Sequence, residues 1–259
     1  MAAALRRAAC LLLALALYYP TSCAQAAFRL DVRPGYGLTR MLWLSDYNAN
    51  LRGSDYDTPV YLLSGDRPGA TALAMGGVHA REIAGVAAAT LMVENARVLE
   101  GRLFVVPCVN AAGMSVPDSL GNRPRALEVA GRSGARFLPW GDRYIPLRPG
   151  EKDPEAFRHP SGFVLKNGAE WRNINRNYPG KADGTPAERV TFAVMELIRR
   201  EGVAFSLDMH EARTFEDALN PKTARWARTA CWRTRSSPTP GRWTLRRRRC
   251  SCWRSGGRR

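Results

Sequence analysis

The chain of 259 residues contains three histidines, and two of them stand where a metal ion could be bound. His79 lies in the run GGVHAREIAG, three residues before Glu82, and His210 lies in the run SLDMHEA. Two imidazole nitrogens and a carboxylate oxygen form a common ligand set for catalytic zinc, which keeps a fourth position open. Such an ion acidifies water and polarises a carbonyl group, so the three residues predict the chemistry of a zinc hydrolase.

The spacing of His79 and Glu82 is a weak signal on its own. In the simpler alternative, His79 is a turn histidine and Glu82 only favours the positive end of a helix. The flanking sequence supports a shared site for the two side chains. Residues 71–78 predict a buried strand and residues 82–99 predict a helix, which places both side chains at a strand-to-helix turn. Side chains three residues apart face the same side of the first helical turn.

The rest of the body alternates strand and helix in the same way. Thr185, Pro186 and Glu188 form the capping box of a second helix. Strands that alternate with helices favour a parallel sheet. We therefore predict an α/β fold with a mixed, mainly parallel sheet flanked by helices. Its strands are expected at residues 58–63, 71–78, 102–109 and 203–209, and residues 110–170 predict loops and short elements.

Two histidines fall at equivalent points of this predicted sheet. His79 follows the strand at 71–78, and His210 follows the strand at 203–209. In open α/β sheets, ligands bind at the edge formed by the carboxyl ends of the strands. The third histidine, His159 in the run FRHPSG, has no such position and is predicted to be a surface residue.

Four motifs together resemble the zinc carboxypeptidase superfamily, which includes the succinylglutamate desuccinylase and aspartoacylase branch. They are GGVHAREIAG, VVPCVNAAG, EWRNINRNYPG and SLDMHEA in this order, and the resemblance covers roughly residues 59–211. The resemblance implies that His79, Glu82 and His210 hold a zinc ion.

The resemblance also implies a site for the carboxylate of the substrate. Asn175 and Arg176 would bind this group, since the planar guanidinium of Arg matches a carboxylate and Asn adds a donor. In the alternative, Arg176 pairs with a structural acid. Arg81 could assist at the site. An arginine is also implied to polarise the scissile carbonyl, and Arg158 and Arg172 both remain candidates for that role.

The two branches of the superfamily imply different reactions. The H-A-R-E form resembles peptidases, whereas RNINRNYPG and the aspartate two residues before His210 resemble the deacylases. Peptidases commonly have an aspartate where this chain has Asn173, as a partner of the first zinc histidine. We expect a zinc hydrolase that cleaves an amide bond next to a free carboxylate, in an N-acyl amino acid. The alternatives are a metallocarboxypeptidase and a non-catalytic relative that binds carboxylates.

The sequence does not supply the general base of such an enzyme. The resemblance implies a glutamate well downstream of His210, but only 49 residues follow, and their carboxylates are Glu211, Glu216 and Asp217. None of the three fits the family position. We therefore expect the zinc hydrolase-like domain, residues 27–221, to be C-terminally incomplete. Loss of the base alone costs about 10²–10⁴-fold in rate.

The first 26 residues predict a secretory signal peptide. Two arginines precede an apolar run of eleven residues, and the small residues Ala24 and Ala26 mark a cleavage site. The apolar run is shorter than the roughly 20 residues that span a bilayer. We expect an exported, periplasmic or secreted protein with no membrane span after cleavage.

The last 38 residues differ from the rest of the chain. Residues 222–259 carry +13 of the net charge of +16 and contain no Asp or Glu. They also hold four of the seven tryptophans and three of the six cysteines, with a C-S-C run, but only one Leu. One alternative is a basic arm that binds nucleic acid. We favour out-of-frame or disordered sequence, and we expect no nucleic-acid partner.

Overall fold

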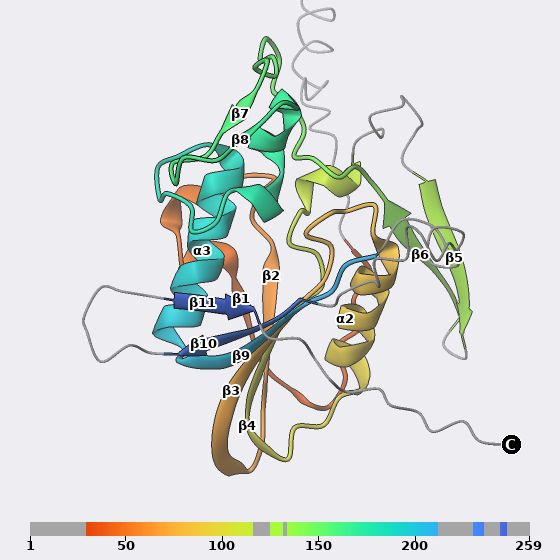
Figure 1. The fold of residues 1–259 in the computed structure, drawn as a ribbon. Helices are drawn as coiled ribbons and strands as arrows, with labels where there is room; N and C mark the ends of the chain where they lie inside the picture. Colours follow the sequence, from red (N-terminus) through yellow and green to blue (C-terminus); the bar gives the residue numbers. More distant parts are fainter. Residues whose placement is uncertain (1–29, 116–124, 132–133, 212–229, 236–243, 248–259) are drawn as a thin grey trace, which may run out of the picture.

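The central feature of the computed structural model is a seven-stranded mixed sheet (Figure 1). The structure describes residues 30–115, 125–131, 134–211, 230–235 and 244–247. The strands lie in the order β1-β2-β4-β3-β9-β10-β11. Their bounds are β1 Leu38–Trp43, β2 Pro59–Ser64, β3 Arg67–Met75, β4 Glu100–Val106, β9 Val203–Asp208, β10 Ala230–Arg235 and β11 Thr244–Arg247.

Parallel pairing is confined to the three central strands. β3 pairs in parallel with β4 on one side and with β9 on the other, whereas the remaining neighbours are antiparallel. The prediction of a mixed α/β sheet is confirmed, and its parallel part is smaller than the sequence suggested. Because β3 and β9 are parallel neighbours, Met75 lies opposite Asp208, and the chain leaves both strands at the same edge.

Two helices cover opposite faces of the sheet (Figure 1). α2 spans Ile83–Asn95 and α3 spans Pro186–Arg200. Phe104 packs in the cluster that contains Val190, Val194 and Leu197 of α3. Its neighbour Val105 packs with Ala89 and Val93 of α2. Consecutive strand residues point to opposite faces, so the two helices form the outer layers of a three-layer fold.

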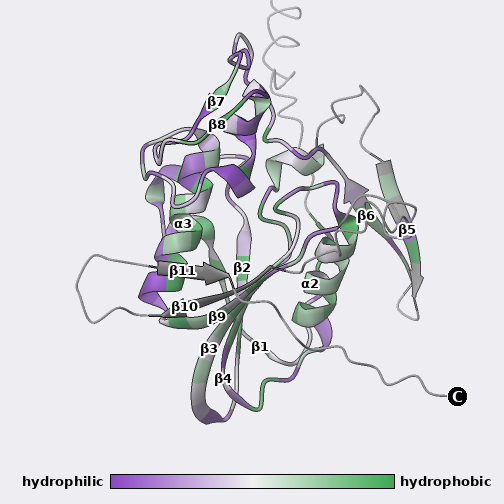
Figure 2. Cartoon of the chain, viewed as in Figure 1, coloured by the Kyte–Doolittle hydropathy of each residue, from purple (hydrophilic) through white to green (hydrophobic). Residues whose placement is uncertain are grey.

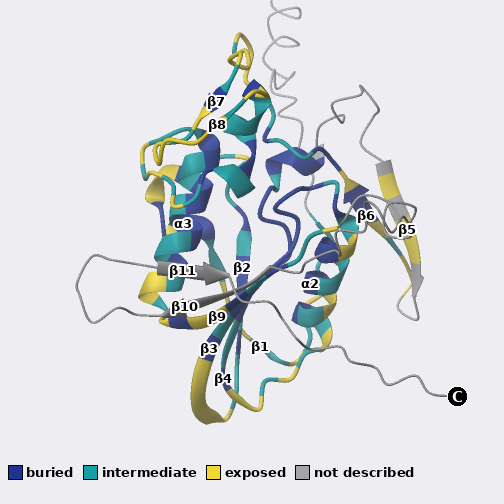
Figure 3. Ribbon diagram, in the orientation of Figure 1, coloured by how far each residue is buried: buried dark blue, intermediate teal, exposed yellow. Residues whose placement is uncertain are grey.

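The colour patterns of the two helices differ (Figure 2). α2 consists mainly of Ala, Val, Leu and Met, and α3 alternates apolar residues with Glu and Arg. The buried side of α3 carries Val190, Val194 and Leu197, and the layer between the helices is the most deeply buried part of the molecule (Figure 3). The i, i+4, i+7 spacing of Val190, Val194 and Leu197 is the one expected of a helix that buries a single face.

The other elements are short and lie mostly between residues 110 and 180. Two hairpins, β5–β6 and β7–β8, stand apart from the main sheet. Their strands are β5 Arg125–Gly131, β6 Gly134–Trp140, β7 Phe157–Arg158 and β8 Val164–Leu165. The described residues also form five 3-10 helices, namely η1 Leu44–Asp46, η2 Ala49–Leu51, η3 Ala112–Ser115, η4 Gly168–Arg172 and η5 Ile174–Arg176. The expectation of loops and short elements here is confirmed.

The structure contains strands in two places where the sequence predicted none. β1 was not predicted, since its residues LTRMLW lack a regular alternation of polar and apolar side chains. Residues 222–259 were predicted to have no regular structure, yet β10 and β11 within them extend the sheet from β9. Strand pairing uses backbone groups, which every non-proline residue carries, so it requires no side-chain period. The predicted signal peptide, residues 1–26, lies outside the described residues.

None of the described helices is both long enough and apolar enough to cross a membrane.

The start of α3 gives a direct test of the predicted capping box. The Thr185 side chain accepts a hydrogen bond from the Glu188 backbone, and the Glu188 carboxylate accepts one from the Thr185 N–H. Thr185→Ala removes the first bond and should lower the free energy of unfolding by about 1 kcal/mol. Urea denaturation measures this change. Thr185→Ser keeps the hydroxyl and serves as the control; equal losses in both variants would contradict a role for the cap.

Candidate metal centre

Close packing of α2 against the ends of two strands brings the three predicted ligands together. Glu82 is the N-cap residue of α2, and His79 and His210 follow β3 and β9. A Cβ atom on Gly85 would lie 2.5 Å from the carbonyl oxygen of Met209, and one on Gly76 would lie 2.3 Å from that of Gly85. Only glycine permits these approaches. Gly76 and Gly85 therefore allow the close backbone packing that brings Glu82 next to His210.

The Glu82 carboxylate lies between the two imidazole rings. His79 Nδ1 is 2.6 Å from one carboxylate oxygen, and His210 Nδ1 is 2.7 Å from the other. The ring centroids are 4.9 Å apart. One ligand atom from each of the three residues lies within 4.8 Å of the other two. His79 and Glu82 are buried, and the side chain of His210 is 21% exposed, so solvent reaches the cluster from the His210 side.

The outer nitrogen of each ring has an oxygen partner. His79 Nε2 lies 3.0 Å from Asn173 Oδ1, and His210 Nε2 lies 2.9 Å from Asp208 Oδ2. Each Nε2 therefore donates its proton outward. This arrangement leaves the two Nδ1 atoms as the ligand atoms that face Glu82. An outer oxygen partner of this kind orients a metal-binding histidine and increases its basicity.

The electrostatics of the cluster follow from these contacts. Burial by itself raises the pKa of Glu82, but hydrogen bonds from His210 and His79 reverse this effect and lower the pKa to about 2. Burial by itself lowers the pKa of His210, but hydrogen bonds to Asp208 and Glu82 raise it to about 9. In the absence of metal, protons therefore hold together the groups that a cation would otherwise join.

The donor set fits a zinc ion. Two imidazole nitrogens and one carboxylate oxygen converge, the outer nitrogens are anchored, and the ring of His210 is open to solvent. Three protein ligands with a fourth position for water or substrate characterise catalytic zinc sites. Within the described residues, no other group of three or more His, Cys, Asp or Glu side chains has this geometry.

Arg143 also lies at the cluster, although it belongs to none of the motifs found in the sequence. Its Nη1 atom is 3.4 Å from His79 Nδ1 and 4.0 Å from a Glu82 oxygen. The residue stands in the irregular segment that follows β6, within the part of the chain that lacks a pattern. Only the fold, which returns this segment across the end of β3, could reveal it.

The two arginines proposed to polarise a carbonyl lie elsewhere. Arg172 donates to both carboxylate oxygens of Asp153 at 2.7 Å and to the carbonyl of Ile145 at 2.6 Å. Arg158 is exposed on β7. Neither contacts His79, Glu82 or His210, whereas Arg143 does. Among the described residues, Arg143 is the arginine best placed for the role.

The predicted carboxylate-binding residues stand on η5 beside the cluster. Arg176 Nε lies 3.3 Å from Glu170 Oε2, and the Arg176 side chain is 36% exposed. Arg176 therefore pairs with a structural acid on one edge, as in the alternative interpretation of the sequence, and still reaches solvent. Asn175 is half-buried, and its side chain forms no hydrogen bond with a described residue. Its amide remains available to a ligand.

Arg81 and His159 have no contact with the cluster. Arg81 is half-buried and forms no hydrogen bond or ion pair with a described residue. His159 was predicted to be a surface residue, but it is partly buried. Its ring stacks on Phe163 with centroids 4.5 Å apart, and its Nε2 lies 3.0 Å from the carbonyl oxygen of Tyr178. Its role in the fold is structural.

The carboxylates around the cluster already have partners. Asp208 binds His210, and Glu211 accepts a hydrogen bond from the backbone N–H of Ala84 in the first turn of α2. Glu170 binds Asn173, Tyr144 and Arg176. Glu211 therefore caps the first turn of α2. Glu216 and Asp217 lie outside the described residues.

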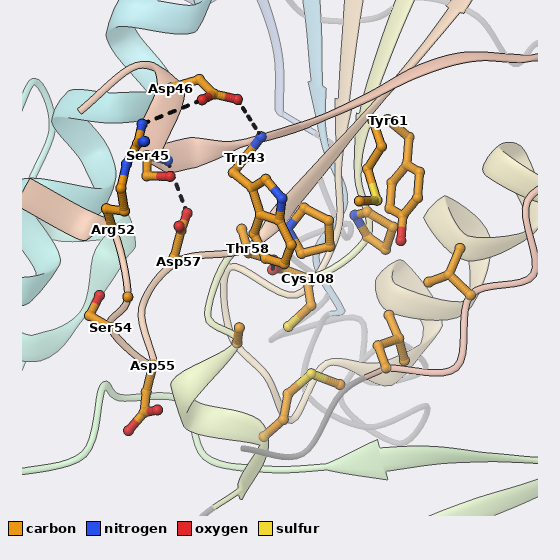
Figure 4. Close-up of a pocket in the computed structure, with 18 residues that line it drawn as sticks. Trp43, Ser45, Asp46, Arg52, Ser54, Asp55, Asp57, Thr58, Tyr61 and Cys108 are labelled. Carbon is orange, nitrogen blue, oxygen red and sulfur yellow. Dashed lines mark hydrogen bonds and ion pairs between the residues drawn. The ribbon is translucent and has the colours of Figure 1, made fainter. Parts of the chain in front are cut away.

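A separate cavity of about 610 Å³ lies under the edge of the sheet (Figure 4). Trp43, Thr58, Tyr61 and Cys108 line it, and the hydrogen bond from the Ser45 N–H to Asp57 closes one wall. None of the candidate metal ligands and none of the predicted carboxylate-binding residues borders this cavity. It is not the site that the sequence predicted.

Comparisons with known proteins give matches among solved structures. One is a succinylglutamate desuccinylase/aspartoacylase from Rhodobacter sphaeroides, with 22% identity, 60% of this chain and 34% of that chain covered, and a TM-score of 0.38. Another is an aspartoacylase family protein from Mesorhizobium loti, with 22% identity, coverages of 71% and 42%, and a TM-score of 0.35. A third is the ectoine utilization protein EutE (DoeB) from Ruegeria pomeroyi, with 21% identity, coverages of 60% and 33%, and a TM-score of 0.34.

The first two structures carry the name of the family that the motifs resemble. The chain covers 33–42% of the length of these three proteins. No protein-family model matches the chain, and no curated protein does.

The cluster predicts how stability depends on pH in the metal-free chain. The lowered pKa of Glu82 gives stability that is present above its ordinary value of 4.5 and is lost as the pH falls toward 2. The raised pKa of His210 gives stability that is present below 6.5 and is lost as the pH rises through about 9. Between pH 4.5 and 6.5 both groups contribute fully to the free energy of unfolding.

The urea midpoint of the chelator-treated chain should therefore be highest between pH 4.5 and 6.5. His210→Asn should flatten the decline on the basic side and also weaken the one on the acidic side, because His210 is the main partner that lowers the pKa of Glu82. A wild-type midpoint that stays constant as the pH rises through 9 would contradict the role of His210.

Proposed function

We propose that this chain comes from an exported zinc hydrolase that cleaves an amide bond next to a free carboxylate, in the manner of an N-acyl amino acid deacylase. The observation that carries the proposal is the convergence of His79 Nδ1 and His210 Nδ1 on the Glu82 carboxylate at the ends of two parallel strands. That edge is where α/β sheets bind their ligands.

The three ligands would hold the zinc ion, and the surrounding residues would keep them in place. Bound there, zinc supplies Lewis-acid chemistry that polarises a carbonyl and makes water more acidic. Asn173 and Asp208 hold the two rings so that Nδ1 of each faces inward. Arg143, which is 20% exposed and borders His79 and Glu82, can donate hydrogen bonds to a carbonyl oxygen as negative charge develops on it.

Arg176 and Asn175 would recognise the carboxylate next to the scissile bond. Arg176 uses Nε for Glu170, its side chain is 36% exposed, and its Nη1 makes a 3.5 Å contact with the Asn175 carbonyl. A guanidinium held at one edge presents its remaining donors in a fixed direction, which favours a carboxylate. The preference for small or peptide substrates with a free carboxylate rests on this pair.

Proton transfer needs one further group. The described carboxylates near the cluster already hold His210, Asn173 and the α2 backbone in place, so we assign none of them as the base. The proposal for this chain is therefore zinc and carboxylate binding, with hydrolysis dependent on a base outside the described residues. A metallocarboxypeptidase and a non-catalytic carboxylate-binding relative remain the alternatives, and they predict different products.

Export is proposed from residues 1–26 alone, whose charge and apolar pattern are typical of a signal peptide. Sequencing the N-terminus of the mature chain tests it: a chain that keeps Met1 after export would contradict cleavage.

The first prediction from the proposed function concerns zinc. The chain should bind zinc in a one-to-one complex, and His79→Ala or His210→Ala should weaken binding by more than about 100-fold, since even an outer partner is worth 10–100-fold. His159→Ala removes the third histidine and serves as the matched control. Isothermal titration and metal analysis measure these affinities. Equal affinity in His79→Ala and wild type would place the zinc elsewhere and contradict the site.

The second prediction concerns the carboxylate. Arg176→Ala should weaken binding of an N-acyl amino acid to the zinc-loaded chain by about 10- to 100-fold, the equivalent of one or two charged hydrogen bonds. Arg158→Ala, which changes the exposed residue of β7, should have no effect. Hydrolysis of the N-acyl amino acid indicates a deacylase, release of a C-terminal residue from a peptide indicates a carboxypeptidase, and binding without turnover indicates the non-catalytic relative. Unchanged affinity in Arg176→Ala would contradict the assigned carboxylate site.

A further inference from the structure

The side chain that orients His79 is an amide and not a carboxylate. Asn173 is fully buried. Its Oδ1 accepts hydrogen bonds from the backbone N–H of Asn175 and from His79 Nε2, both at 3.0 Å. Its Nδ2 donates to Glu170 Oε2 at 2.7 Å. An amide has one accepting and one donating end, so its direction must be fixed by its neighbours.

Two of these neighbours can act in only one way. A backbone N–H can only donate, and an ionised carboxylate can only accept. Asn175 and Glu170 therefore set the direction of the Asn173 amide from its two ends. If the amide turned over, its NH₂ group would face the Asn175 N–H and its oxygen would face the Glu170 carboxylate. With the observed direction, His79 must donate from Nε2.

Glu170 is itself held in place. Its side chain is 12% exposed and accepts a hydrogen bond from the Tyr144 hydroxyl at 3.1 Å. Arg176 Nε lies 3.3 Å from Oε2 and Arg143 Nε lies 4.0 Å from Oε1. The residue that contacts His79 is therefore a neutral amide, and the negative charge lies one residue further away, on Glu170 between the two arginines. From there the Glu170 carboxylate acts on His79 through the Asn173 amide and pairs with the arginines directly.

We propose that Glu170 is a positioning residue for the metal centre, acting through the Asn173 amide to fix the proton of His79 on Nε2. Glu170 and Asn173 work as a pair: the neutral amide touches the imidazole, and the carboxylate behind it keeps the amide in the accepting direction. Hydrogen bonds in such a chain polarise one another and strengthen each link. The proposal rests on the proposed function for the metal itself, but its hydrogen-bond chain exists in the metal-free protein.

Placing a carboxylate at position 173 while Glu170 stays would bring two negative charges together. In Asn173→Asp, the new carboxylate oxygen would stand at the 2.7 Å contact now made by Nδ2, facing Glu170 Oε2. Two carboxylates at that distance cannot both be ionised without a large cost. An aspartate at position 173 is therefore compatible with the site only if residue 170 is uncharged. Were Asn173 independent of Glu170, Asn173→Asp alone would be at least as good a partner for His79.

The first experiment measures solvent exchange of the His79 Nε2 proton by nitrogen-15 NMR in the metal-free full-length chain. Glu170→Ala should speed this exchange by about tenfold, the effect of losing one hydrogen bond of average strength. Glu94→Ala is the matched control: its side chain is 10% exposed and pairs with Arg136 at 2.6 Å, at the far end of α2. Equal exchange rates in wild type and Glu170→Ala would overturn the proposal.

The second experiment measures zinc affinity across a set of variants. Asn173→Asp should bind zinc about 10- to 100-fold more weakly than wild type, the range for loss of an outer partner. Asn173→Asp combined with Glu170→Gln should recover most of that loss, since glutamine can donate to the aspartate. Tight binding by Asn173→Asp alone, or no recovery in the double variant while both remain folded by circular dichroism, would overturn the pairing.

The two experiments separate this proposal from the proposed function. If no variant and no wild-type chain binds zinc, but Glu170→Ala still exposes the His79 proton, the zinc hydrolase is refuted and the positioning role stands. If zinc binds equally to wild type, Asn173→Asp and Glu170→Ala, the metal site stands and the positioning role is refuted.

Discussion

The carboxylate of Glu82 is the group on which the arrangement of the site depends. One oxygen binds His79, the other binds His210, and the backbone N–H of Glu211 also donates to it at 3.2 Å. These partners come from segments more than 120 residues apart in sequence, so a single side chain joins the ends of β3 and β9 to the start of α2. Removing it would leave two histidines facing each other with no acceptor between them, a costly state for buried polar groups.

The rest of the fold serves this contact through close backbone packing and outer hydrogen bonds. Gly85 lets α2 approach Met209, and Gly76 lets the turn after β3 pass under α2. Asp208 and Asn173 then hold the outer nitrogens, and Glu170 connects Asn173 to Arg176 and Tyr144. The candidate metal ligands and Arg176, the arginine proposed to bind a carboxylate, therefore belong to one continuous network. A change at Glu170 is expected to reach both.

The sequence predicted the central strands from local patterns, and it predicted the candidate metal cluster from the places where two of these strands end. Apolar runs predicted β2, β3, β4 and β9, and the capping box at Thr185 predicted the start of α3. His79 and His210 could be paired because parallel neighbours end at one edge of the sheet.

Arg143 and Glu170 could not be found in the same way. Both stand in residues 110–170, where Pro, Gly and Arg obscure any period, and their roles depend on contacts between distant segments. The assignment of the carbonyl-polarising arginine was open between Arg158 and Arg172 for that reason. The structure turns Arg172 toward Asp153 and leaves Arg158 exposed.

X-ray absorption at the zinc edge of the zinc-loaded full-length chain tests the proposed metal centre. We expect a shell of nitrogen and oxygen atoms at about 2.0–2.2 Å with the outer scattering of two imidazole rings. The chain also carries a C-S-C run at residues 250–252, which offers zinc a different ligand set. A dominant sulfur shell at about 2.3 Å, or the absence of imidazole scattering, would contradict the His79, Glu82 and His210 centre.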